Sequence, residues 1–113
     1  MTSDPLSIEI SVQQVQELQQ AGDEFLFIDC RETVEYGIAK IEGTQLIPMN
    51  EIPTRIAEIE DHRDKRIVVH CHHGGRSMQV TQYLRQQGFE KTQNMAGGID
   101  VWSQEIDAAI PRY

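Results

Sequence analysis

Apolar residues along the chain fall into short runs of strand length, separated by longer stretches with helical spacing. The runs at residues 24–30 and 66–70 are largely apolar, which is typical of strands covered on both faces. Shorter runs at residues 8–10, 45–48 and 92–95 predict three further strands. This alternation predicts an α/β fold with a mostly parallel central sheet of about five strands and helices on both faces.

Four stretches have the spacing of amphipathic helices. In the first, Ser11 and Gln14 have the spacing of a capping box, which predicts that the helix begins directly after Ser11. In the second, Asn50 is a candidate helix cap. The third begins at Gly75, directly after a cysteine loop, and Gly88 ends it. The predicted helices span residues 11–22, 50–61, 75–87 and 99–106.

Composition narrows the class of protein. A chain of 113 residues with 39% hydrophobic residues and no internal repeat predicts one globular domain, residues 1–113. The formal net charge of −8 argues against nucleic acid or an anionic membrane as a partner. No apolar run approaches the roughly 20 residues of a membrane span, and residues 1–5 do not resemble a signal peptide. We therefore expect a cytoplasmic protein whose two cysteines, Cys30 and Cys71, are free thiols.

The chemistry is concentrated where two predicted strands end. Cys71 follows one buried strand and precedes the helix that begins at Gly75, so its thiol lies where backbone N–H groups and a helix N-terminus favour an anion. Asp29, Cys30 and Arg31 end the other buried strand. Because parallel strands end at one edge of a sheet, both groups belong at that edge.

Three segments resemble a known family. They are Asp29-Cys30-Arg31 with Glu35-Tyr36 and the following residues to Pro48, the loop Cys71–Ser77, and Gly97-Gly98 followed by Trp102. Together they are similar to the rhodanese-like sulfurtransferases in their single-domain form. The resemblance implies a rhodanese-like fold over the whole chain and a catalytic Cys71 that carries sulfur as a persulfide.

The resemblance also implies the partners of the reaction. A small anionic donor such as thiosulfate gives its outer sulfur to Cys71, and cyanide or a thiol accepts it; a protein donor or acceptor is a further candidate, and no cofactor is implied. Arg76 is expected to favour the thiolate and to bind the anionic group of the donor. The expected substrate-binding loop is His72, His73, Gly74, Gly75, Arg76 and Ser77, with Asp29 and Arg31 in support.

Two other hypotheses remain. Cysteine-dependent phosphatases and arsenate reductases use a similar loop, with five residues between the cysteine and the arginine. Here four residues separate Cys71 from Arg76. A phosphate ester needs a wider cradle, so the shorter loop favours a single transferable sulfur atom. The third hypothesis is an inactive rhodanese-like domain that binds or senses a partner.

Several side chains near the loop have more than one interpretation. We expect no metal site, because adjacent His72 and His73 cannot easily turn toward one ion. Cys30 is either a thiol that resolves a Cys71 persulfide or a packed core residue, and we favour packing. Arg31 either pairs with Asp29 or faces the substrate. His70 is expected to pack beneath the loop, and Glu35, Tyr36 and Trp102 are interpreted as fold residues.

Overall fold

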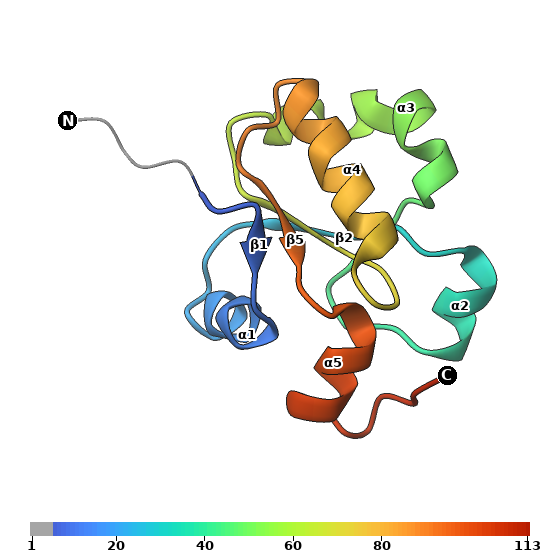
Figure 1. Ribbon diagram of the computed structural model, residues 1–113. Helices are drawn as coiled ribbons and strands as arrows, with labels where there is room; N and C mark the ends of the chain where they lie inside the picture. Colours follow the sequence, from blue (N-terminus) through green and yellow to red (C-terminus); the bar gives the residue numbers. More distant parts are fainter. Residues whose placement is uncertain (1–5) are drawn as a thin grey trace.

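The computed structural model describes residues 6–113 (Figure 1). The prediction about a signal peptide concerns residues 1–5 and lies outside the described residues. The strands are β1 (Glu9–Ile10), β2 (Leu26–Asp29), β3 (Gln45–Leu46), β4 (Ile67–His70) and β5 (Thr92–Met95). The α-helices are α1 (Val12–Gln20), α2 (Thr33–Ile38), α3 (Ile52–Arg55), α4 (Gly75–Gln86) and α5 (Gly98–Glu105), with 3₁₀ helices η1 (Met49–Glu51) and η2 (Ile56–His62).

The five strands form one sheet in the order β1-β5-β4-β2-β3, and every neighbouring pair is parallel. The predicted fold class is therefore confirmed. Strands β2 and β4 lie side by side in the middle, with Asp29 opposite His70 in the register. The residues that follow these two strands, Cys30 and Cys71, consequently emerge next to each other at the carboxyl edge of the sheet.

Helices cover both faces of the sheet, and each face has its own apolar core (Figure 1). On one face, α3, η2 and α4 pack on alternate residues of β2 and β4, including Ile28 and Val69. On the other face, α1 and α5, the latter with Trp102, pack on Phe27 of β2 and Val68 of β4. Because both faces are covered, the central strands are apolar up to their last residues, Asp29 and His70, as the sequence indicates. None of the helices in residues 6–113 is long and apolar enough to cross a membrane.

Helix boundaries were predicted with mixed success. The capping box is confirmed, since the Gln14 N–H donates to Ser11 Oγ (3.1 Å) and the Ser11 N–H to Gln14 Oε1 (3.0 Å). The single helix predicted over residues 50–61 is wrong: the segment is η1, α3 and η2, and Asn50 lies inside η1. Pro53 lies in the first turn of α3, where a residue without an N–H is tolerated. Helix α2 has no counterpart in the predicted pattern.

Candidate active site

The thiol of Cys71 lies in a cradle formed by its own loop. Its Sγ accepts hydrogen bonds from the Gly74 N–H (3.1 Å), the Ser77 N–H (3.3 Å) and the Ser77 hydroxyl (3.2 Å). Gly74 has φ +110°, a left-handed conformation that glycine adopts without a steric penalty and that turns the loop into α4. The sulfur therefore faces donors at the start of a twelve-residue helix, an arrangement that stabilises a negative charge.

The Ser77 hydroxyl has two acceptors but one proton. Besides Cys71 Sγ, it contacts the amide oxygen of Asn94 in β5. The Asn94 Nδ2 group donates to Gly74 O and to Glu9 Oε2 (both 3.2 Å), which fixes the amide with its oxygen toward Ser77. The hydroxyl can therefore turn its proton to the sulfur when Cys71 is ionised and to Asn94 when it is not.

The turn before α5 holds the backbone of the Cys71 loop. The Ile99 N–H donates to Cys71 O (2.9 Å), and the Asp100 N–H donates to His72 O (3.1 Å). Gly98 has φ +62°, and a Cβ there would lie 2.5 Å from each of these two carbonyl oxygens. A side chain at this position would push the loop away, so the Gly97-Gly98 pair belongs to the site as well as to the fold.

Arg76 lies at the end of the loop but is already paired. Its Nη1 and Nη2 groups donate to Glu35 Oε1 (2.7 Å) and Oε2 (3.0 Å) in α2. Hydrogen bonds from Arg76 lower the pKa of Glu35 to about 2, and the same pair raises the pKa of Arg76. An anionic donor that uses these two N–H groups must therefore displace Glu35.

Asp29 and Arg31 form a fully buried ion pair, so the structure selects one of the two interpretations of Arg31. Arg31 Nη2 lies 2.6 Å from Asp29 Oδ2, and Arg31 Nε lies 2.9 Å from Asp29 Oδ1; both side chains are 0% exposed. Arg31 also donates to the carbonyl oxygen of Ala39 (2.6 Å). The pair ties the end of β2 to the segment after α2.

Cys30 is buried in the same apolar cluster as Cys71. Its N–H donates to the carbonyl oxygen of His70 (3.0 Å), which continues the β2–β4 ladder. Burial, reinforced by the nearby charges of Cys71 and Asp29, raises the pKa of the Cys30 thiol far above its ordinary value. A thiol that resists ionisation is a poor nucleophile, which favours the packing interpretation.

The histidines around Cys71 have separate environments. His70 is fully buried against the ring of Phe27, and burial lowers its pKa. The rings of His72 and His73 stack with centroids 3.9 Å apart, and burial lowers the pKa of His72. Among residues 6–113, no group of three or more His, Cys, Asp or Glu side chains is arranged to hold a metal ion.

The segments that form the site also match a known protein family. A model of the rhodanese-like domain matches residues 11–105, which include β2, the Cys71 loop and all of α5. The chain belongs to the rhodanese-like family.

Relatives of this rhodanese-like chain differ in length. The putative sulfurtransferase YtwF of Bacillus subtilis is 38% identical over 97 residues, which cover 86% of this chain and 91% of that protein. Rhodanese-like/PpiC domain-containing protein 12 of Arabidopsis thaliana is 39% identical over 93 residues, 80% of this chain but 31% of that protein. The crystal structure of thiosulfate sulfurtransferase from Pseudomonas aeruginosa matches with a TM-score of 0.78 and 27% identity, covering 87% of this chain and 19% of that one. The chain thus corresponds to one part of some relatives and to nearly all of others.

Sequence reasoning missed three contributors to the site of this rhodanese-like domain. Glu35 was interpreted as a fold residue, yet it holds Arg76. Asn94 orients the Ser77 hydroxyl. Tyr113 stacks on His72, with ring centroids 3.9 Å apart. A buried strand that carries an asparagine is an available signal for Asn94, but no local pattern marks the other two.

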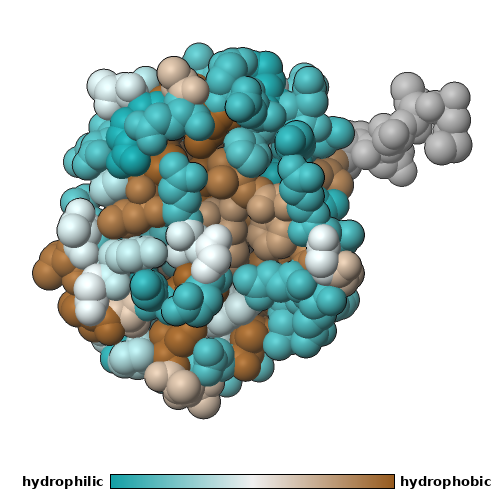
Figure 2. All heavy atoms as spheres, turned by 180° about the vertical axis from the view of Figure 1, so that it is seen from behind, coloured by the Kyte–Doolittle hydropathy of each residue, from teal (hydrophilic) through white to brown (hydrophobic). Residues whose placement is uncertain are grey.

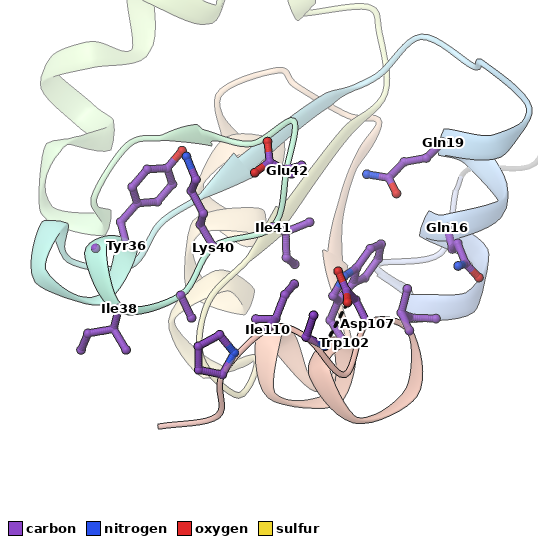
Figure 3. A pocket seen from close by; sticks show the side chains of 15 residues that line it. Gln16, Gln19, Tyr36, Ile38, Lys40, Ile41, Glu42, Trp102, Asp107 and Ile110 are labelled. Carbon is purple, nitrogen blue, oxygen red and sulfur yellow. Dashed lines mark hydrogen bonds between the residues drawn. The ribbon is translucent and has the colours of Figure 1, made fainter.

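A cleft lies away from Cys71. It has a volume of about 570 Å³ and is lined by α1, the end of α2 with the segment after it, and α5 with the chain that follows it (Figure 3). Trp102 and Ile110 lie at one side, with Gln16 and Gln19 of α1 opposite Tyr36 and Lys40. Seen from behind, the molecule exposes hydrophobic side chains among hydrophilic ones (Figure 2). The cleft borders the segment that leads to Tyr113.

Proposed function

We propose that this rhodanese-like domain is a sulfurtransferase that carries a sulfane sulfur as a persulfide on Cys71. The observation that supports this proposal is the set of three hydrogen bonds that Cys71 Sγ accepts from the loop and Ser77. These donors stabilise the thiolate that attacks the donor and becomes the leaving group when the acceptor removes the sulfur. Relatives named sulfurtransferases agree with this activity.

The transfer has two steps. The Cys71 thiolate attacks the outer sulfur of thiosulfate, a new S–S bond forms, and the S–S bond of thiosulfate breaks so that sulfite leaves with the electron pair. An acceptor nucleophile, cyanide or a thiolate, then attacks the outer sulfur of the persulfide. Thiocyanate or a new persulfide leaves, and the Cys71 thiolate returns to the three donors of the loop.

The loop residues have different roles in the proposed reaction. Gly74 and Ser77 hold the sulfur, and His72 and His73 form part of the rim. Arg76 brings a positive charge near the sulfur, and the Glu35 carboxylate fixes its direction. Gly75 begins α4 and leaves open space beside the loop, since a Cβ there would meet no atom within 4 Å. The small open rim suits a small anionic donor, and it also leaves a protein-bound persulfide as a candidate donor or acceptor.

Intact-mass spectrometry after treatment with thiosulfate tests the proposal. We expect the protein to gain one sulfur atom, to lose it on addition of cyanide, and to form thiocyanate. Cys71→Ser should gain none, whereas the control Cys30→Ala should gain sulfur as the unaltered protein does. Sulfur uptake by Cys71→Ser would remove Cys71 from its proposed role.

The same preparation separates the other hypotheses. Hydrolysis of an aryl phosphate with inhibition by vanadate, without sulfur uptake, would instead support a phosphatase. Reduction of arsenate would support a reductase. Absence of all three activities, together with capture of a partner that is insensitive to alkylation of Cys71, would support an inactive binding or sensing domain.

A further inference from the structure

Tyr113 joins two separate parts of the site. Its hydroxyl accepts a hydrogen bond from Arg31 Nη1 (2.7 Å) and donates one to Glu35 Oε2 (2.8 Å). Its ring stacks on the ring of His72, with centroids 3.9 Å apart and planes 8° apart. Since Glu35 holds Arg76, Tyr113 contacts the start of the Cys71 loop directly and its end through one carboxylate.

The rings beside the loop form one continuous wall. His72 stacks on His73 as well as on Tyr113, each with a centroid separation of 3.9 Å. Two rings cannot occupy the same face of His72, so its ring lies between the other two. Cys71 itself is 1% exposed. A reagent must therefore approach its sulfur through the narrow space that the loop and this wall leave open.

Residues 107–113, here called the strap, are attached at a few points. The Ser103 hydroxyl donates to Ile110 O (2.5 Å), and Arg112 Nε lies 3.0 Å from Asp100 Oδ1. Most of the strap is exposed, and Tyr113 itself is 39% exposed.

Between its attachments the strap borders the cleft of about 570 Å³ (Figure 3). Ile110 packs on the apolar core, whereas residues 111–113 are exposed and are held by the Arg112–Asp100 ion pair and the contacts of Tyr113. This end of the strap can therefore detach without disturbing the core.

We propose that Tyr113 determines which acceptors reach the sulfur on Cys71, by closing one side of the loop while the strap is attached. This inference rests on the proposed sulfur transfer and adds its selectivity. Small nucleophiles such as cyanide pass the closed Tyr113, and acceptors with bulky substituents react when Tyr113 leaves His72 and Glu35. The two hydrogen bonds of the Tyr113 hydroxyl with Arg31 and Glu35, together with the stacking of its ring on His72, determine how often Tyr113 leaves its closed position.

Two variants separate the ring from the hydroxyl. Tyr113→Ala removes both the ring and the hydrogen bonds, whereas Tyr113→Phe keeps the ring and loses the bonds to Arg31 and Glu35. Tyr36→Ala is the matched control, because Tyr36 is also a half-exposed tyrosine but lines the cleft instead of contacting the loop. Circular dichroism confirms that each variant is folded.

The first measurement is the rate of Cys71 alkylation by iodoacetamide and by a bulky aryl maleimide, with peptide mapping to separate Cys71 from Cys30. For Tyr113→Ala we expect the maleimide rate to rise about five- to tenfold and the iodoacetamide rate to change less than about twofold. Tyr113→Phe should show a maleimide increase of about two- to threefold. Tyr36→Ala should match the unaltered protein with both reagents.

The second measurement is removal of persulfide sulfur by cyanide and by glutathione, followed by intact mass. Tyr113→Ala should accelerate transfer to glutathione and leave transfer to cyanide within about twofold. The proposal would be overturned if Tyr113→Ala changed the rates of small and bulky reagents by the same factor, or if it changed neither rate. If the unaltered protein took up no sulfur, the proposed function would fail. The ratio of the maleimide rate to the iodoacetamide rate at Cys71 would still decide whether Tyr113 controls access to the thiol.

Discussion

The guanidinium of Arg76 and the carboxylate of Glu35 meet through two parallel hydrogen bonds of 2.7 and 3.0 Å at the edge of the Cys71 loop. The arginine comes from the loop and the glutamate from α2, 41 residues earlier in the chain. A planar guanidinium and a carboxylate in this geometry fix each other's orientation. The positive charge near Cys71 therefore has a defined direction before any donor binds.

This ion pair makes stability depend on acid pH. Hydrogen bonds from Arg76 lower the pKa of Glu35 from 4.5 to about 2, so the pair stabilises the fold fully above about pH 4.5 and less as the pH falls toward 2. We expect Glu35→Gln to lower the free energy of unfolding by about 1–2 kcal/mol at pH 7. Urea unfolding at several pH values should show this difference shrinking toward pH 2. The control Glu58→Gln, in an exposed pair with Arg55, should have a much smaller effect.

A difference between Glu35→Gln and the unaltered protein that stayed constant from pH 7 to pH 2 would contradict this account. It would mean that the glutamate acts through packing and not through its charge.

The Ser77 hydroxyl should make the Cys71 thiolate easier to form. Ser77→Ala removes one of three donors to the sulfur, and we expect alkylation of Cys71 by iodoacetamide at pH 7 to slow by about tenfold. Sulfur uptake from thiosulfate should slow in parallel. Thr81→Val is the control, because Thr81 lies one turn further along α4 and no atom of the described residues bonds its hydroxyl. Equal alkylation rates for Ser77→Ala and Thr81→Val would show that the hydroxyl does not act on the sulfur.

The buried Asp29–Arg31 pair should be costly to break. Asp29→Asn leaves the Arg31 guanidinium buried without a compensating charge, and we expect the free energy of unfolding to fall by about 3–5 kcal/mol. Urea unfolding at pH 7 measures the change. Glu24→Gln breaks the exposed pair between Glu24 and Lys65, which should leave stability nearly unchanged. Similar losses in the two variants would argue that Arg31 finds other partners when Asp29 is removed.

Gly98 should be required for the shape of the Cys71 loop. Gly98→Ala adds a Cβ 2.5 Å from the carbonyl oxygens of Cys71 and His72, so we expect sulfur uptake to fall about tenfold or more in addition to a loss of stability. Gly43 also has a positive φ, +87°, but a Cβ there meets no atom within 4 Å. Gly43→Ala should therefore cost only about 1–2 kcal/mol of stability and leave sulfur uptake intact. Normal uptake by folded Gly98→Ala would show that the loop tolerates displacement.

The hydrophobic pattern was sufficient for the sheet but not for every helix. Continuous apolar runs identify β2 and β4 because both faces of a central strand are covered. Helix α2 was not predicted because it is short and buries none of its residues completely, so its sequence shows no apolar stripe. The helix predicted from Asn50 failed because its spacing of isoleucines fits 3₁₀ turns as well as an α-helix.

The sequence by itself determined the parallel sheet, the place of Cys71 at a strand end, and the loop that leads into α4, since these follow from local periodicity and from glycines at a turn. Only the tertiary structure decided that Arg76 pairs with Glu35, that Ser77 shares its hydroxyl between Cys71 and Asn94, and that Tyr113 lies on His72. Each of these contacts joins different elements of the fold. Their geometry depends on how strands and helices pack, and spacing along the chain does not encode it.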